Sequence, residues 1–159
     1  MGGTRGKGNM FINPKAEYNV YQDADAASII FNSGATIKVM GADITSNLEL
    51  NDEIYAKYLE MNTTSSILTY NLVKGTYQTW GDNIMHDPVT VLSHLNSNAV
   101  KLKSYYCVVN TTNPDVEGTN YGTIDFYEPT DNIRANILYS DSINLDICWQ
   151  ILEEMLGKY

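Results

Sequence analysis

In the first half of the chain, polar stretches alternate with short apolar runs, and residues that typically cap helices lie at the ends of these runs. Residues 1–22 are rich in Gly and Asn, and we expect them to form a loop that carries polar groups. Asp23 is an N-cap candidate and Gly34 a stop signal, which together predict a helix over 24–31. The other elements expected here are a strand at 37–40 and helices at 51–60, 65–77 and 89–95, the last of them opened by Pro88.

The second half changes character, because it contains three segments rich in Tyr, Val and Ile with turn residues between them. These segments predict strands at 100–110, 121–127 and 133–139. The last segment, 142–156, is an amphipathic helix, since Ile143, Ile147, Ile151 and Met155 recur every four residues. Helices mixed with strands in this way indicate an α/β domain. Neither an internal repeat nor a low-complexity linker interrupts it, so we expect a single unit over 1–159.

Composition and charge narrow the classes of function. The chain has 159 residues, of which 43% are hydrophobic, as in one globular domain. Its net charge is −9 and its ten Lys and Arg do not cluster, which argues against binding to nucleic acid. No apolar stretch approaches the ~20 residues that a membrane span requires. Cys107 and Cys148 both lie in apolar runs, so we expect buried thiols in a reducing cytoplasm.

The first candidate site is the step Glu17-Tyr18-Asn19. Side chains alternate along an extended backbone, so Glu17 and Asn19 fall on the same side of such a segment. A carboxylate beside a carboxamide suits a ribose, whose hydroxyls both donate and accept hydrogen bonds. The alternative, which is commoner for an isolated motif of this kind, is a turn with polar side chains on the surface.

The second candidate site is His86-Asp87, near the middle of the chain. An imidazole can protonate a departing nucleobase near neutral pH, and a neighbouring carboxylate can bind a hard cation such as calcium. The alternative is that Asp87 only caps the helix that Pro88 opens.

Six short elements follow one another within residues 1–88. They are Met1-Gly2-Gly3, Gly8-Asn9, Pro14-Lys15-Ala16-Glu17-Tyr18-Asn19, Asp23-Ala24-Asp25-Ala26-Ala27, Gly41-Ala42-Asp43-Ile44-Thr45 and His86-Asp87-Pro88. In this order they resemble the inosine–uridine preferring nucleoside hydrolase family. The resemblance implies the C-terminal portion of a nucleoside-hydrolase-like α/β fold, an open mixed sheet flanked by helices.

The resemblance also implies roles for individual residues. It implies a calcium ligand in Asp87, a general acid for the leaving base in His86, and base contacts from Tyr70 and Tyr77 on the helix before them. The residues that it implies for holding the ribose hydroxyls are Asn9, Glu17 and Asn19. Asn9 and Glu17 are eight positions apart, which is longer than the family's spacing. Either the loop has an insertion, or Asn13 takes the place of Asn9.

The aspartate-rich motif that supplies most calcium ligands in the family, and activates the attacking water, has no counterpart in this sequence. The resemblance therefore predicts the C-terminal part of an N-ribohydrolase, an enzyme that cleaves the N-glycosidic bond of ribonucleosides in purine or pyrimidine salvage. We expect this chain alone to be inactive or incomplete. The alternative is a non-enzymatic nucleoside-binding or assembly module. In either case we expect a homo-oligomer or a complementing N-terminal half as partner, because an edge strand and apolar surface would need cover.

Overall fold

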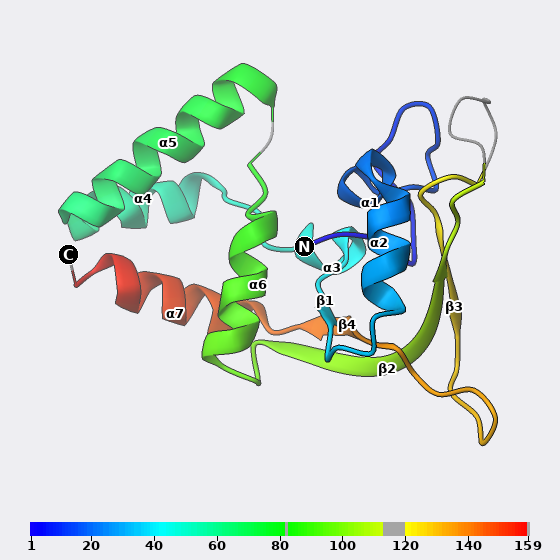
Figure 1. The fold of residues 1–159 in the computed structure, drawn as a ribbon. Coiled ribbons are helices and arrows are strands. Elements are labelled where there is room, and N and C mark those ends of the chain that lie inside the picture. The colour runs from blue at the N-terminus through cyan, green and yellow to red at the C-terminus, as the bar shows by residue number, and fades with distance from the viewer. Residues whose placement is uncertain (82, 113–119, 159) are drawn as a thin grey trace.

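A computed structural model describes residues 1–81, 83–112 and 120–158, with the side chain of Trp80 excepted. Four of the described helices gather in one part of the molecule, and the sheet with the three shorter helices forms the other (Figure 1). The helices are α1 (Tyr18–Gln22), α2 (Ala24–Phe31), α3 (Ala42–Thr45), α4 (Asp52–Met61), α5 (Thr64–Trp80), α6 (His86–Leu95) and α7 (Leu145–Leu156). The strands are β1 (Lys38–Val39), β2 (Val100–Val109), β3 (Ile124–Tyr127) and β4 (Ile137–Ile143).

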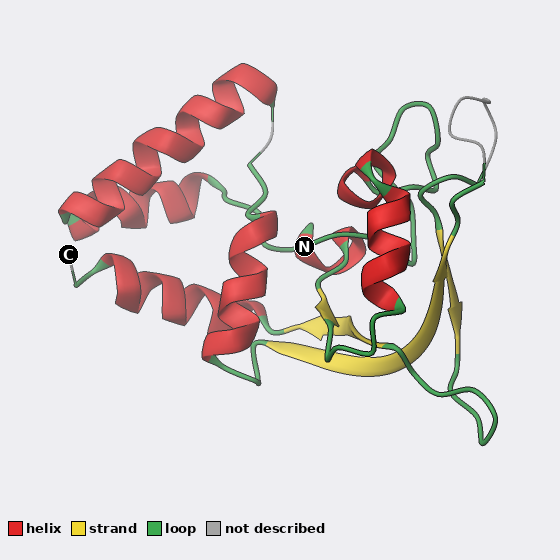
Figure 2. Ribbon diagram, in the orientation of Figure 1, coloured by secondary structure: helices red, strands yellow, loops and turns green. Residues whose placement is uncertain are grey.

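The four strands form one open sheet in the order β1-β4-β2-β3. β1 runs parallel to β4, with Lys38 opposite Leu138, whereas β2 is antiparallel to both β4 and β3. β2 is the long curved strand in Figure 2, and its register with β4 shifts between Lys101 and Leu102. The structure confirms the expected α/β class with an open mixed sheet and flanking helices.

Three apolar clusters hold the elements together. The first lies between the sheet and α2, where Tyr139, Tyr105 and Phe31 are buried. The second lies under α6 and α7, around Leu92 and Cys148, and the third joins α4 to its neighbours around Tyr58. Among the described helices, none has both the length and the apolar character that crossing a membrane requires.

Three expected boundaries in the first half are wrong, and α3 was not expected from the sequence. The stretch 1–22 is not a loop throughout, because its last residues form α1, which Glu17 caps. α6 begins at His86 rather than after Pro88, since a proline in the first turn gives up an N–H that has no partner within the helix. Asp87 is therefore not the cap that the alternative interpretation required; the N-cap is Met85, whose side chain makes no capping hydrogen bond. α5 is longer than expected and runs from the capping box of Thr63 to Gly81.

Two strands are also displaced from their expected positions. β3 begins at Ile124, because Gly122 takes a left-handed conformation (φ 74°) in the turn before it. β4 begins at Ile137 and continues to Ile143, where its pairing with β2 ends. The last helix consequently begins at Leu145 and not at Ser142, and the side chain of Asn144 caps it.

Candidate functional site

Glu17 caps helix α1 with a carboxylate that is 1% exposed. Its Oε1 accepts a hydrogen bond from the N–H of Asn19 at 2.9 Å. Its Oε2 accepts from Gly3 at 2.7 Å and from Val20 at 3.2 Å. The bond from Gly3 ties the start of the chain to α1. A carboxylate offers about four acceptor positions, so three protein donors leave roughly one for a ligand.

The three candidate asparagines differ in how the protein holds them. Asn9 is exposed, and its Oδ1 accepts from the N–H of Tyr18 at 2.7 Å, which closes the loop over α1. Asn19 is also exposed, and its Nδ2 donates to Met1 O at 3.4 Å. Asn13 is buried, and its Nδ2 donates to Tyr121 O at 3.2 Å across the fold. The structure thus presents Asn9 at the surface beside α1 and Asn19 at the surface within α1, and Asn13 fastens the loop.

The loop is closely packed at Gly8. A Cβ at this position would lie 1.9 Å from Ala16 O, so only glycine allows the two backbone segments to approach. The N–H groups of Gly8 and Asn9 donate to Pro14 O at 2.7 Å and to Ala16 O at 3.1 Å. This packing brings Asn9 to the N-terminus of α1 in spite of its eight-residue separation from Glu17.

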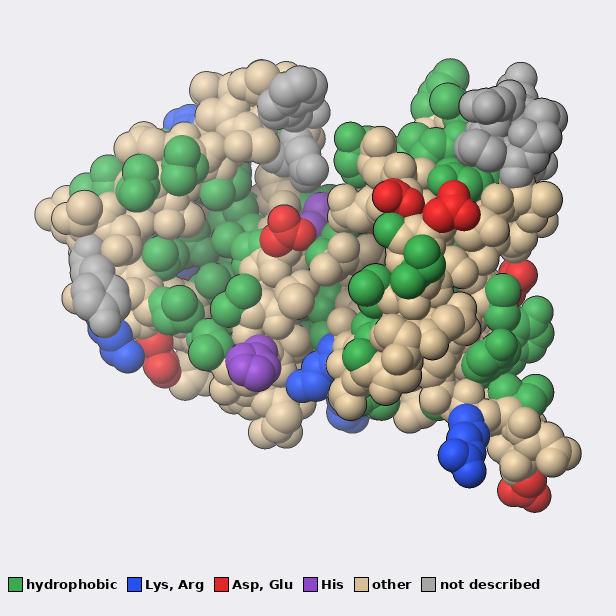
Figure 3. Space-filling view, in the orientation of Figure 1, with side chains coloured by type: hydrophobic (Ala, Val, Ile, Leu, Met, Phe, Trp, Pro, Cys, Tyr) green, Lys and Arg blue, Asp and Glu red, His purple; other side chains and the backbone are tan. Residues whose placement is uncertain are grey.

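His86 and Asp87 lie in the first turn of α6, beside a groove of ≈ 350 Å³. The groove is lined by Leu72, Val73 and Thr76 of α5 and by residues 84–88. Thr45 Oγ1 lies 2.7 Å from His86 Nδ1, and Asp87 is exposed. In the space-filling view this face is hollowed between the two parts of the molecule, and an acidic and a histidine side chain lie together at the edge of the hollow (Figure 3).

Helix α3 connects the two candidate pieces, which are far apart in sequence. At its start, the N–H of Ala42 donates to Gly3 O at 2.8 Å, and the N–H of Gly3 donates to Glu17. At its end, Thr45 contacts His86. α3 directly follows β1, at the carboxyl end of a parallel strand, where open α/β sheets commonly bind ligands. One short helix therefore fixes both pieces in a single body.

Asp43 anchors α3 to the sheet. Its Oδ1 accepts a hydrogen bond of 2.5 Å from the hydroxyl of Tyr139, which is fully buried in β4. Burial, and secondarily this bond to Asp43, raises the pKa of Tyr139 well above its ordinary value. A Cβ on Gly41 would lie 1.6 Å from the Tyr139 hydroxyl, so glycine is required there.

Neither Tyr70 nor Tyr77 is among the residues that line the groove beside His86. Tyr70 packs edge-on against Tyr55, with ring centroids 5.8 Å apart, and its hydroxyl accepts from Lys74 Nζ at 2.5 Å. Tyr77 is half exposed. The groove instead receives Leu72, Val73 and Thr76, which sequence reasoning missed. Leu72 and Val73 lie four and three positions before Thr76, spacings that place each of them beside Thr76 on the helix surface, and this was the available signal.

The described residues do not make a calcium site by themselves. Over 1–81, 83–112 and 120–158 there is no group of three or more His, Cys, Asp or Glu side chains that could hold a metal ion. Calcium takes six to eight oxygen ligands, and Asp87 supplies at most two of them. The residues present in this part of the chain therefore do not fit the ion that the resemblance implies.

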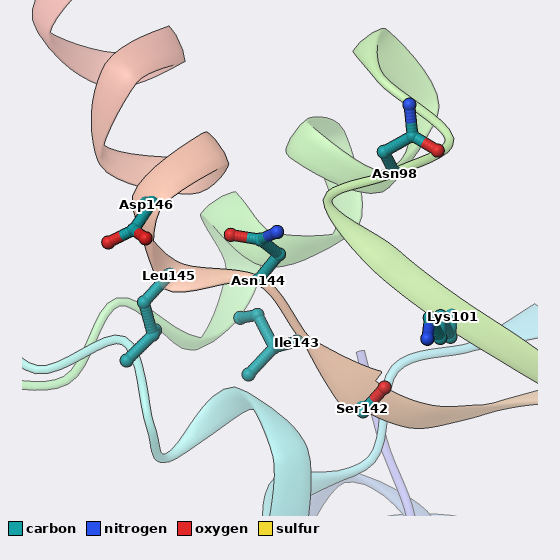
Figure 4. Close-up of a pocket in the computed structure, with 7 residues that line it drawn as sticks. All are labelled: Asn98, Lys101, Ser142, Ile143, Asn144, Leu145 and Asp146. Carbon is teal, nitrogen blue, oxygen red and sulfur yellow. The ribbon is translucent and has the colours of Figure 1, made fainter.

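A separate pocket of ≈ 390 Å³ lies where β2, β4 and α7 meet. Figure 4 shows the seven residues that line it. One of them is Asn144, whose side chain caps α7. The lining residues are Asn98, Lys101, Ser142, Ile143, Asn144, Leu145 and Asp146. It contains none of the candidate site residues that the sequence indicated, and we assign it no role.

Comparison with known proteins gives a consistent result. A profile of the inosine-uridine preferring nucleoside hydrolase family matches residues 1–150. The pyrimidine-specific ribonucleoside hydrolase RihA of Photobacterium profundum is 29% identical over 167 residues, and RihB of Escherichia coli O17:K52:H18 is 26% identical over 166. Each match covers 100% of this chain but only 52% and 51% of those proteins, so the chain spans about half the length of the curated relatives it matches.

Solved structures agree at the level of the fold. A purine-preferring ribonucleoside hydrolase from Gardnerella vaginalis superposes with a TM-score of 0.80 at 20% identity, covering 99% of this chain and 50% of that one. An inosine-uridine preferring nucleoside hydrolase from Bacillus anthracis gives a TM-score of 0.77 at 19% identity, covering 99% and 50%. The ordered motifs, the sheet and the profile match together show that this chain belongs to the inosine–uridine preferring nucleoside hydrolase family.

Proposed function

We propose that this chain supplies the sugar-facing and base-facing residues of a ribonucleoside N-ribohydrolase. The observation that carries this proposal is the set of contacts made by α3. Its first residue bonds Gly3, which in turn bonds Glu17, and its last residue contacts His86. In this proposal Asn9, Glu17 and Asn19 receive the ribose hydroxyls. Ribose needs both donors and acceptors, which two carboxamides and a carboxylate provide.

His86 acts as the proton donor to the departing base in this proposal. The groove beside it has an apolar wall from Leu72 and Val73, which suits the face of a nucleobase, and one hydroxyl from Thr76. As the bond between base and sugar breaks, the base nitrogen gains negative charge and takes a proton. An imidazole is suited to this step near neutral pH. The contact with Thr45 through Nδ1 leaves Nε2 as the donor atom.

We further propose that the chain does not hydrolyse nucleosides alone. Asp87 contributes one of the calcium ligands, and the other ligands and the group that activates water come from outside the residues described here. The test is incubation of the purified chain with inosine, uridine and an activated aryl riboside in the presence of calcium. We expect no turnover; a rate on the order of 1 per second would show that this chain holds a complete site.

The role of Asp87 has a matched control within the chain. Asp87 and Asp25 each lie in the first turn of a helix, where a carboxylate interacts favourably with the helix dipole. Asp87→Asn and Asp25→Asn therefore remove the same charge from equivalent places. In a protein completed by an N-terminal half that supplies the other ligands, we expect only Asp87→Asn to weaken calcium binding measured by titration calorimetry, and equal effects of the two variants would remove Asp87 from the ligand set.

We also propose that this chain associates with a second chain. The second chain is either another copy of this one or a complementing N-terminal half. Ile29 and Ile30 of α2 are 71% and 54% exposed, and Ile30 borders a groove of ≈ 360 Å³ that reaches Met1 and Val39. Exposed apolar side chains beside a two-residue edge strand favour cover by another chain. Light scattering over a concentration series should show a mass above that of one chain; a monomer at every concentration would contradict this. The two buried thiols favour a reducing, cytoplasmic setting.

A further inference from the structure

Thr45 contacts His86, and no motif in the sequence predicts this contact. Thr45 is 0% exposed at the end of α3, and His86 begins α6, 41 residues further along the chain. The Thr45 Oγ1 and His86 Nδ1 atoms lie 2.7 Å apart, which is a short hydrogen bond for an oxygen and a nitrogen. The contact occupies Nδ1 of the imidazole, and His86 is also one of the residues that line the groove.

The direction of this hydrogen bond follows from the surroundings of Thr45. A threonine in a helix often donates to the carbonyl four residues earlier, which is Gly41 O here. That carbonyl already accepts from the N–H groups of Ile44 at 3.0 Å and Thr45 at 2.9 Å. A carbonyl oxygen has two lone pairs, so both are used. A buried hydroxyl needs an acceptor, and among the described residues the one within reach is His86 Nδ1.

The support beneath Thr45 is rigid. α3 is tied to β4 twice, since Tyr139 donates to Asp43 and the N–H of Gly41 donates to Ser140 Oγ at 2.9 Å. A hydroxyl that donates from a fixed position makes the neutral imidazole carry its proton on the opposite nitrogen, because Nδ1 must then be the acceptor.

We propose that Thr45 is a positioning residue that orients the His86 ring and holds the neutral form with its proton on Nε2. This inference rests on the proposed function for its meaning: the imidazolium gives its Nε2 proton to the leaving base and becomes neutral, while the Thr45 hydroxyl, which can rotate, then accepts from the Nδ1–H that remains. It also gives the Gly41–Thr45 segment a part in that function, with a different role for each of its two polar side chains. Asp43 anchors the short helix, and Thr45 aims the proton donor.

The tautomer can be read directly by nitrogen-15 NMR of the histidine rings at a pH of about 8.5, well above the ordinary histidine pKa of about 6.5. The chain has two histidines, and exposed His94 at the other end of α6 is an internal control. We expect His86 to show a protonated Nε2 and an unprotonated Nδ1, further separated in shift than the two nitrogens of His94. His86→Ala assigns the signals.

Three variants separate positioning from stability. Thr45→Val removes the hydroxyl, and the two His86 nitrogen shifts should move toward those of His94. Thr45→Ser keeps the hydroxyl and should retain the wild-type pattern. Ser66→Ala removes another fully buried hydroxyl, in the capping box of α5, and should lower the melting temperature without moving the His86 signals.

Two results would overturn the proposal. One is a wild-type His86 that carries its proton on Nδ1, and the other is a Thr45→Val spectrum identical to wild type. If Thr45→Val does not fold, the wild-type spectrum and the retained pattern in Thr45→Ser still decide the matter. None of these measurements uses a nucleoside, so a failed proposal about Thr45 is distinguishable from a failed proposal about nucleoside hydrolysis.

Discussion

Replacing Glu17 by glutamine tests whether its carboxylate holds the N-terminal loop to α1. The carboxylate accepts three backbone hydrogen bonds, from Gly3 and Val20 at Oε2 and from Asn19 at Oε1. A glutamine amide can keep one oxygen in place, but its NH2 group must then face one of the remaining N–H donors. Two donors pointing at each other in a site that is 1% exposed cannot both be satisfied.

The expected loss of stability follows from these contacts. An unsatisfied buried donor costs about 1–3 kcal/mol, and Glu17→Gln creates one on the backbone and one on the side chain. Allowing for partial relaxation, we expect Glu17→Gln to lower the free energy of unfolding by roughly 2–4 kcal/mol. That is a large part of the ~5–15 kcal/mol that stabilises a typical domain.

Asp23→Asn is the matched control, because Asp23 is an exposed N-cap that accepts one hydrogen bond, from Ala26 at 2.8 Å. Asparagine caps about as well as aspartate, so its expected cost is only a few tenths of a kcal/mol. The assay is urea unfolding at pH 7, where a slope of about 2 kcal/mol per M places the Glu17→Gln midpoint roughly 1–2 M below wild type. Equal midpoints for the two variants would refute the capping role of Glu17.

Other predictions follow from the surroundings of two glycines and from the burial of a cysteine thiol and a tyrosine hydroxyl. Gly41→Ala should be strongly destabilising in a thermal melt, because its Cβ would lie 1.6 Å from the Tyr139 hydroxyl, whereas Gly75→Ala in α5 meets no atom within 4 Å and should stabilise by ~0.5–1 kcal/mol. Burial raises the pKa of Cys107 to about 12, so a thiol reagent at pH 8 should modify it only in urea. Burial also raises the pKa of Tyr58 to about 12. Both groups bind their protons more tightly when folded, so stability is full below the unfolded values of about 8.5 and 10 and should fall as pH rises from there toward 12. Stability that is flat up to pH 11 would contradict this.

Elements with strong local signals could be predicted from the sequence. Asp23 caps α2 as expected, and the apolar repeat of residues 143–155 predicted the last helix, although Asn144 rather than Ser142 opens it. Its first turn was misplaced because β4 extends to Ile143, and strand length is set by pairing with β2, a contact more than 30 residues away. Local spacing carries no information about such pairing.

The candidate site divides in the same way. The pairs Glu17 with Asn19 and His86 with Asp87 are neighbours in sequence, so their motifs are visible there. The contact between Thr45 and His86 spans 41 residues and is invisible until α3 is placed against α6. The expectation of base contacts from Tyr70 and Tyr77 rested on the family resemblance and stays a prediction, while the phase of α5 brings Leu72 and its neighbours to the groove.

The most direct test of the central proposal combines this chain with the part of the Photobacterium profundum relative that it does not match, since the chain covers 52% of that protein. The measurement is kcat/KM for inosine, uridine and an aryl riboside, with wild type, His86→Ala and His94→Ala. We predict activity only in the combined protein. His86→Ala should lose ~10²–10⁴-fold on the nucleosides and little on the aryl riboside, whose leaving group needs no proton, while His94→Ala loses nothing. Equal losses on all three substrates for His86→Ala, or full activity of this chain alone, would contradict the account.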